Sequence, residues 1–210
     1  MNHCRCAAHA SPRRIVLTGG PGAGKTAVLE LVQYYLCRHV RVLPESAGIL
    51  FGGGFPRGGS ALARRATQRA IFYVQRELET ASSECDAAIL LCDRGTVDGM
   101  AYWPGPDDLF QSVGTSRLDE LARYHAVVHL RTPPENGGYN QSNPLRLETA
   151  AEAAAIDRRI AEAWTGHPRI HVVDSAPNFL AKARQALAIL RDELPECCRR
   201  HMPPAIAIGA

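Results

Sequence analysis

A glycine-rich octapeptide at residues 19–26 sets the strongest limit on how this chain folds. It fits the pattern G-x-x-x-x-G-K-[ST] at every fixed position and consists of Gly19, Gly20, Pro21, Gly22, Ala23, Gly24, Lys25 and Thr26. A β-branched run ends at Thr18, and apolar residues at helical spacing follow Lys25. Glycines let successive backbone N–H groups turn toward one anion, and a helix N-terminus adds partial positive charge. The octapeptide therefore predicts an anion-binding loop that joins a strand to a helix.

The rest of the chain repeats this alternation of short apolar runs and longer helical stretches. Strands are expected at 14–18, 40–43, 87–92, 126–130 and 170–173. Helices are expected at 25–39, 60–83, 116–123, 148–164 and 179–190. Alternating strands and helices indicate a parallel sheet with helices on both faces. We expect a three-layer α/β/α fold around a five-stranded parallel sheet, with ligands at the carboxyl ends of the strands.

Composition limits the other possibilities. With 210 residues, 46% of them hydrophobic, the chain suits one domain at 13–192, a flexible N-terminal tail at 1–12 and a C-terminal tail at 193–210. No stretch approaches the roughly 20 apolar residues of a membrane span. A net charge of +3 is too small to indicate nucleic acid. Because the first residues lack the apolar core of a secretory signal, we expect a cytoplasmic protein without integral membrane association.

The cysteines do not predict a disulfide framework, because there are seven of them, an odd number scattered along the chain. Some of them lie with histidines in the two tails, where a metal clamp would require both termini to meet. Their spacing matches no zinc pattern, so a metal site there is not favoured. The tail residues concerned are His3, Cys4, Cys6, His9, Cys197, Cys198 and His201.

The octapeptide is a P-loop by pattern and by context. Lys25 is expected to reach the β- and γ-phosphates of a nucleotide, and the Thr26 hydroxyl to bind Mg²⁺. Asp93 directly follows the buried run 87–92 and is the second candidate metal ligand, although an aspartate there can also cap a turn. No Asn-Lys-x-Asp occurs, which argues against a signalling GTPase. We also expect no room for the helical lid domain of oligomeric AAA-type motors.

Three further residues suggest phosphoryl transfer to a small molecule. Glu45 follows the second strand and is placed to accept the proton of an attacking hydroxyl, or else is a solvated loop residue. Arg94 follows Asp93 and suits oxyanions, or else pairs with Asp98. Arg146 lies in a lid segment at about 131–148, where it would offset charge on the transferring phosphate. Its rivals for that role are Arg131, Arg158 and Arg159.

Polar and aromatic residues between these motifs offer weaker candidates for substrate contact. Gln68 and Gln75 stand seven residues apart on one face of the helix at 60–83, with Phe72 between them. They could read and stack on a ring, but an ordinary polar helix edge with one core aromatic is the favoured interpretation. Tyr102 and Trp103 could line a pocket, although such residues more often anchor a loop to the core.

Several segments together resemble a known family. They are GGPGAGKT, PESAG, CDRGTVDGMAYW, LRTPPENGGYNQSNPLRLETAAEAAAIDRRIAEAWTGHP and FLAKARQAL. The chain is similar over residues 13–191 to small P-loop AAA-type ATPase or kinase-like proteins, which include bacterial predicted ATP/GTP-binding proteins and the TRPL translocation defect proteins. More loosely, the layout is similar to deoxynucleoside kinases and the ribosylnicotinamide kinase domain.

This resemblance implies a nucleoside-kinase-like P-loop fold with nucleotide at Gly19 to Thr26. Glu45 would be the base, Asp93 and Arg94 the metal and acceptor pair, and Arg146 the lid arginine. The expected function is Mg²⁺-dependent transfer of phosphate from ATP, with GTP possible, to a hydroxyl of a small metabolite such as a nucleoside. The alternatives are an ATP- or GTP-dependent regulator with a lipid or protein partner, and simple NTP hydrolysis. The oligomeric state stays open.

Overall fold

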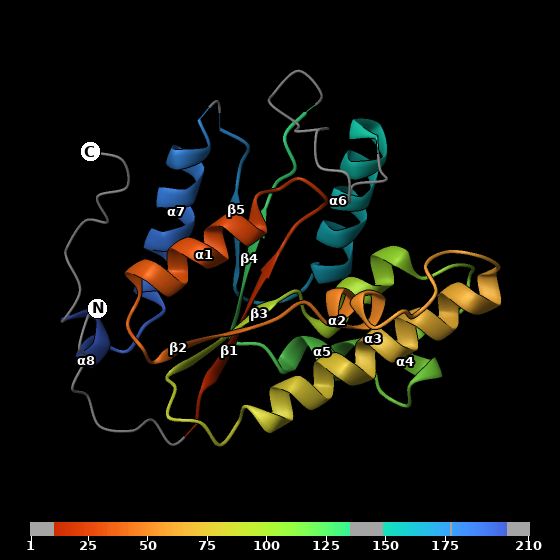
Figure 1. The fold of residues 1–210 in the computed structure, drawn as a ribbon, viewed down its shortest axis with the longest axis horizontal. Helices are drawn as coiled ribbons and strands as arrows, with labels where there is room; N and C mark the ends of the chain where they lie inside the picture. The colour runs from red at the N-terminus through yellow and green to blue at the C-terminus, as the bar shows by residue number, and fades with distance from the viewer. Residues whose placement is uncertain (1–10, 135–148, 177, 201–210) are drawn as a thin grey trace.

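A five-stranded, all-parallel sheet organises the chain (Figure 1). The computed structural model describes residues 11–134, 149–176 and 178–200. The strand order is β2-β3-β1-β4-β5. The strands are β1 (Arg13–Thr18), β2 (Val40–Leu43), β3 (Ile89–Asp93), β4 (Ala126–Leu130) and β5 (Ile170–Val173). Helices cover both faces, which confirms the predicted three-layer α/β/α fold.

The helices include elements that the sequence did not predict. The helical segments are α1 (Lys25–Tyr35), α2 (Ser46–Gly52), α3 (Ala61–Ala81), η1 (Thr96–Tyr102), α4 (Leu109–Ser112), α5 (Arg117–Ala122), α6 (Ala150–Trp164), α7 (Phe179–Asp192) and α8 (Glu196–Arg199). The additions are α2, η1, α4 and α8. All four have seven residues or fewer, too few to show a helical repeat of apolar residues. Helix α1 is four residues shorter than expected, because Leu36 is already extended.

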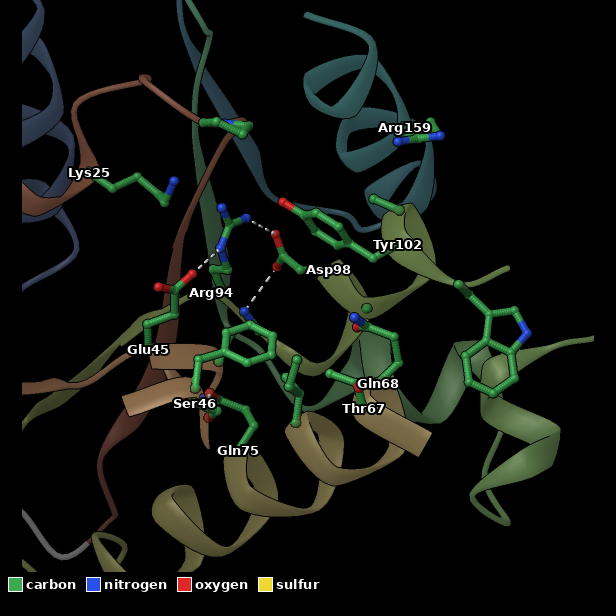
Figure 2. Close-up of a pocket in the computed structure, with 18 of the residues that line it drawn as sticks. Lys25, Glu45, Ser46, Thr67, Gln68, Gln75, Arg94, Asp98, Tyr102 and Arg159 are labelled. Carbon is green, nitrogen blue, oxygen red and sulfur yellow. Dashed lines mark hydrogen bonds and ion pairs between the residues drawn. The ribbon is translucent and has the colours of Figure 1, made fainter. Parts of the chain in front are cut away.

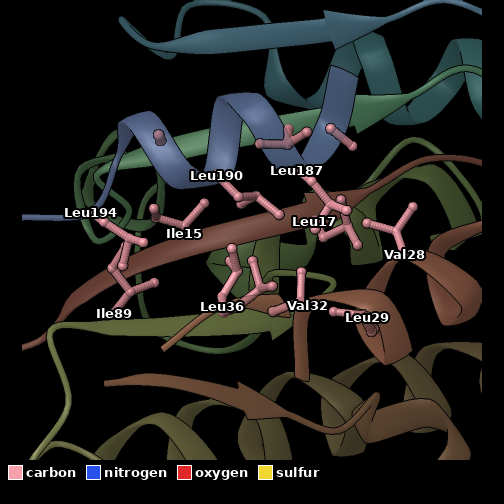
Figure 3. Packing of buried hydrophobic residues seen from close by; sticks show 14 of the residues in the cluster. Ile15, Leu17, Val28, Leu29, Val32, Leu36, Ile89, Leu187, Leu190 and Leu194 are labelled. Carbon is pink, nitrogen blue, oxygen red and sulfur yellow. The ribbon is translucent and has the colours of Figure 1, made fainter. Parts of the chain in front are cut away.

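One face of the sheet packs against α1 and α7. Alternate residues of β1 point to opposite faces, and Ile15 and Leu17 point to this one. Figure 3 shows them packed against Val28 and Val32 of α1 and Leu187 of α7. Both helices therefore bury an apolar stripe here, which holds α1 and the loop before it against the sheet.

The opposite face carries the second part of the core. Val16 of β1 and Leu90 of β3 point to this side, where they pack with Phe72 of α3 and Ile160 and Trp164 of α6. Trp164 is 1% exposed and is the largest fully buried side chain of the described chain. Phe72 is thus a core residue, as the sequence analysis favoured.

Packed structure continues beyond residue 192, where the sequence analysis had placed the start of a C-terminal tail. Leu194 is 2% exposed and Cys198 is fully buried, and both belong to the core cluster beneath α1 and α7. The described segment 193–200 therefore packs onto the domain. Within the described residues, no helix combines the length and apolar character needed to cross a membrane.

Candidate active site

The loop between β1 and α1 is held in a shape that requires glycine. Gly24 has φ +93° at the N-terminus of α1, and a Cβ there would lie 2.8 Å from the Phe179 ring. At Gly19, with φ +137°, a Cβ would lie 2.1 Å from the Leu130 carbonyl oxygen. The Lys25 ammonium folds back over the loop and donates to the carbonyl oxygens of Gly19 at 3.0 Å and Gly20 at 3.3 Å.

A buried aspartate fastens this loop to the neighbouring elements. Asp157 of α6 accepts the Gly20 backbone N–H at 2.9 Å. The same carboxylate lies 2.8 Å from His129 Nε2 and 3.4 Å from Arg131 Nη1. Despite burial, these hydrogen bonds lower the pKa of Asp157. Arg131, a rival for the lid arginine in the sequence analysis, thus contacts the carboxylate that supports the loop.

Lys182 supports the loop from the other side. Its ammonium, on α7, donates to the Ala23 carbonyl oxygen at 2.8 Å and also to the carbonyl oxygen of Arg131. Burial lowers the pKa of Lys182 to about 8. The sequence analysis did not predict this role or that of Asp157. The one available signal was that Lys182 is the second of only two lysines in the chain.

Arg94 joins two carboxylates beside the loop. Its Nε donates to Glu45 Oε1 at 2.7 Å, and its Nη1 donates to Asp98 Oδ1 at 3.4 Å (Figure 2). The Arg94–Asp98 pair that was weighed as a structural alternative is therefore present together with the contact to Glu45. Burial raises the pKa of Glu45, but the adjacent Arg94 guanidinium outweighs it and the net pKa lies below its usual value. Glu45 is thus ionised near neutral pH.

The Arg94 backbone adopts a conformation that side chains rarely take. Its φ is +70°, the single positive value for a non-glycine residue of the described chain. An L-residue in this region costs roughly 1–2 kcal/mol. Its N–H donates to the Leu17 carbonyl oxygen at 3.1 Å, which helps to hold the turn after β3. Backbone strain of this kind persists only where the surrounding structure holds the residue in place, and such residues cluster at functional sites.

Asp98 is a connecting residue that the sequence analysis considered only as a partner for Arg94. It is 3% exposed, and its Oδ1 also accepts the Thr18 hydroxyl. Its Oδ2 accepts the Gly95 N–H at 2.9 Å and the Trp164 indole N–H at 3.2 Å. The carboxylate therefore fixes η1 to β1 and α6 and orients Arg94. No local sequence pattern distinguishes such an aspartate.

Asp93 fits a divalent cation. It ends β3, and its Oδ1 is buried without a hydrogen-bond partner among the residues that the structure describes. Burial raises the pKa of Asp93 to about 6, although the Lys25 ammonium opposes that rise. An unpartnered buried carboxylate oxygen is a good ligand for Mg²⁺. The exposed Thr26 offers a hydroxyl and lines the cavity described below, whereas Asp93 itself is not among the lining residues.

Lys25 lies in the same electrostatic network. Burial and the nearby Arg94 charge lower its pKa to about 8, while Asp93 and Glu45 act to raise it. The ammonium therefore has a weaker hold on its proton than a surface lysine. A bound polyphosphate would favour the charged form, because it places negative charge next to the amine.

A cavity of about 930 Å³ extends from the loop to α3. Its near wall contains Lys25 and Thr26, and Glu45 and Arg94 lie between this wall and α3. Its lining is completed by Arg57, Arg64, Arg159, Ser46, Thr67, Gln68, Ile71, Gln75, Tyr102 and Trp103, among others. The cavity is thus longer than a site for the phosphates alone.

The two glutamines of α3 differ. Gln75 is 3% exposed and bonded at both ends, since its Oε1 accepts from Ser46 Oγ at 2.7 Å and its Nε2 donates to Glu79 at 2.9 Å. Gln68 is half-buried and lines the cavity. Gln75 therefore connects α2 to α3, whereas Gln68 is the one of the pair with the environment of a substrate contact.

The remaining predicted residues differ in whether they line this cavity. Arg146 and most of the lid segment at 131–148 lie outside the described residues. Of its rivals, Arg159 lines the cavity, whereas the exposed Arg158 is not among the lining residues. Tyr102 lines the cavity with its ring 5.8 Å from the Arg94 guanidinium.

The chain has similarity to known proteins in both sequence and fold. The family described as "AAA domain" matches residues 14–179. No curated protein is similar enough in sequence to count as a relative. A thymidylate kinase from Candida albicans has a similar structure, with a TM-score of 0.58 and 15% sequence identity. The likeness covers 89% of this chain and 93% of that one, so it concerns the whole fold.

Proposed function

The chain belongs to the AAA domain family, and from its site we propose that it is a phosphotransferase. It would move the terminal phosphoryl group of ATP, with Mg²⁺, to a hydroxyl of a small metabolite such as a nucleoside. The kinase-like fold and the resemblance of its motifs to deoxynucleoside kinases support this proposal. The cysteines, seven in number and scattered along the chain, do not suit a disulfide framework and so favour the cytoplasm as its location.

The observation that carries the proposal is the reach of the cavity. It runs from Lys25 past Glu45 to Gln68, so a second molecule has room opposite the terminal phosphate. Glu45 and Arg94 lie between the two ends, where an acceptor hydroxyl would meet the phosphate. The length of this single cavity supports transfer to a second molecule over hydrolysis or sensing of a nucleotide alone.

The residues divide the chemical work. The acceptor oxygen forms a bond to the γ-phosphorus as the bond from that phosphorus to the β-γ bridging oxygen breaks, which leaves ADP. Glu45, ionised by its pairing with Arg94, takes the hydroxyl proton, and its low basicity suits a loose transition state in which that proton leaves late. Lys25 exchanges its two carbonyl partners for phosphate oxygens. Asp93 and Thr26 would hold Mg²⁺, which neutralises phosphate charge when bound.

The experiment is phosphorus NMR of the protein with Mg²⁺ and ATP, alone and with pools of nucleosides and other hydroxylated metabolites. We expect a new phosphomonoester signal together with ADP in one pool. Glu45→Gln should abolish that signal while binding of a fluorescent ATP analogue stays nearly unchanged. Glu77→Gln, an exposed glutamate on α3, is the matched control and should behave as wild type.

Other results would point to the alternatives. Unchanged ATP in every pool, with tight nucleotide binding in the same samples, would refute transfer and favour a nucleotide-dependent regulator with a protein or lipid partner. ADP and inorganic phosphate at equal rates with and without every pool would indicate simple hydrolysis. Loss of nucleotide binding in Glu45→Gln would contradict the role of Glu45 as the base.

A further inference from the structure

Three side chains with metal-binding atoms meet at one end of α1, opposite the end that follows the glycine-rich loop at residues 19–26. Cys37 and His39 lie between α1 and β2, and Cys198 lies in α8, about 160 residues further along the chain. Cys37 Sγ, Cys198 Sγ and one His39 ring nitrogen all lie within 4.8 Å of one another. Cys37 is 2% exposed, and the other two are fully buried. The sequence analysis had grouped Cys198 with tail residues and left out Cys37 and His39.

The spacing of these atoms suits tetrahedral zinc. With Zn–S of about 2.3 Å, Zn–N of about 2.05 Å and a tetrahedral angle, a sulfur and a nitrogen bound to the same ion lie about 3.6 Å apart. Cys198 Sγ and His39 Nδ1 are 3.6 Å apart. A thiol hydrogen bond gives a similar distance for one pair, but it does not require Cys37 to join the same cluster. The third converging donor is what points to an ion.

The other side of the His39 ring has a suitable neighbour. Its Nε2 lies 3.8 Å from Asp86 Oδ1, in the loop before β3. Histidines that bind metals commonly direct their second ring nitrogen toward a carboxylate, which fixes the ring orientation. This arrangement leaves Nδ1 facing the two cysteines. Asp86 is exposed and 3.8 Å is longer than a hydrogen bond, so its charge attracts the ring from the side away from the two cysteines and does not bind the ion.

Charge balance selects the ion. Cys37 and Cys198 belong to the apolar cluster that also contains Leu36 and Leu194, where two isolated thiolates would be strongly disfavoured. Two thiolates and a neutral imidazole around one divalent cation make an uncharged group. Sulfur and imidazole ligands suit Zn²⁺, whereas Mg²⁺ and Ca²⁺ prefer oxygen.

We propose that Cys37, His39 and Cys198 bind one Zn²⁺ ion that ties α8 to the segment between α1 and β2. Helix α8 has four residues and would not be stable by itself, so a cross-link at Cys198 would hold it on the domain. These are the three ligands found among the residues that the structure describes. Helix α1 has 11 residues and is about 16 Å long, so the zinc site is separate from the phosphate loop.

The test begins with the metal content of the full-length chain, purified without chelators. Elemental analysis by inductively coupled plasma mass spectrometry should find about one zinc per chain in wild type. Cys37→Ser and Cys198→Ser should each lose most of it, whereas Cys85→Ser, a matched control outside the cluster, should keep it. Cobalt loaded in place of zinc should give a thiolate-to-cobalt charge-transfer band in wild type and Cys85→Ser, which Cys198→Ser weakens or loses.

A stability measurement keeps the result independent of failed folding in a variant. A strong chelator should lower the melting temperature of wild type and Cys85→Ser, and added Zn²⁺ should restore it. Substoichiometric zinc with no thiolate–cobalt band in wild type would overturn the proposal. So would zinc that both cysteine variants retain. Nucleotide binding, measured on the same variants, reports separately on the loop at residues 19–26.

Discussion

Replacing Asp98 by asparagine should weaken the domain far more than an ordinary surface change. In Asp98→Asn the amide keeps the size of the carboxylate, but one oxygen becomes an N–H donor. If that nitrogen takes the place of Oδ1, it faces the Arg94 guanidinium, another donor. If it takes the place of Oδ2, it faces the N–H groups of Gly95 and Trp164. Neither orientation satisfies all of the groups that the carboxylate binds.

The magnitude follows from those contacts. A lost hydrogen bond to a charged group costs about 1.5–3 kcal/mol, and Asp98 is 3% exposed, so water cannot replace the partner. We therefore expect the free energy of unfolding to fall by about 2–3 kcal/mol. For a domain of this size, that corresponds to a drop of roughly 5–10 °C in melting temperature.

The assay is thermal unfolding followed by circular dichroism and by tryptophan fluorescence, to which the buried Trp164 contributes. Asp119→Asn is the control, because Asp119 is exposed and accepts from the exposed Ser116 hydroxyl. Its melting temperature should stay within about 2 °C of wild type. Equal shifts in the two variants would refute the reasoning, since Asp98 would then contribute no more than a surface carboxylate.

Three further predictions concern the loop and its surroundings. The pKa of Asp93 is about 6 in the folded chain against 3.8 normally, so the free energy of unfolding falls as pH rises from about 4 to about 6. Asp93→Asn should therefore exceed wild type in metal-free stability at pH 7 but not below about pH 4; chemical denaturation at both pH values measures this, and an equal gain at both would contradict it. Lys182→Met leaves the Ala23 carbonyl without its donor and should weaken Mg-ATP binding about 5- to 30-fold in a calorimetric titration; unchanged affinity would exclude a supporting role. Gly24→Ala places a Cβ against Phe179 at φ +93° and should reduce Mg-ATP affinity at least about tenfold by the same titration; wild-type affinity would show that the loop tolerates the change.

The sequence predicted the sheet well because its signals are local. Each of the five strands is a short, mostly apolar run between turn or helix residues. The three central strands β1, β3 and β4 are largely buried, whereas the edge strands β2 and β5 are only partly so. The position of the glycine-rich loop between β1 and α1 was equally predictable, since its glycines and Lys25 all lie within residues 19–25. Asp93 and Arg94 could be placed at the same edge, because the carboxyl ends of parallel strands meet there.

The short elements were beyond reach of the same reasoning. The segment that forms η1 has no helical repeat, and its fold depends on Asp98 binding Thr18 and Trp164 from β1 and α6. Helix α8 likewise depends on packing of Leu194 and Cys198 beneath α1 and α7. Such contacts join residues far apart in the chain, which no local pattern records.

By itself, then, the sequence determined the α/β architecture, the loop between β1 and α1 and the edge of the sheet where chemistry should lie. Only the tertiary structure decided which distant partners meet: Asp157 and Lys182 against the loop, Asp98 against Thr18 and Trp164, and Cys198 beside His39. The physical reason is the range of the interactions. Periodic burial and turn chemistry act over a few residues, whereas a buried charge or thiol is defined by whatever the completed fold places next to it.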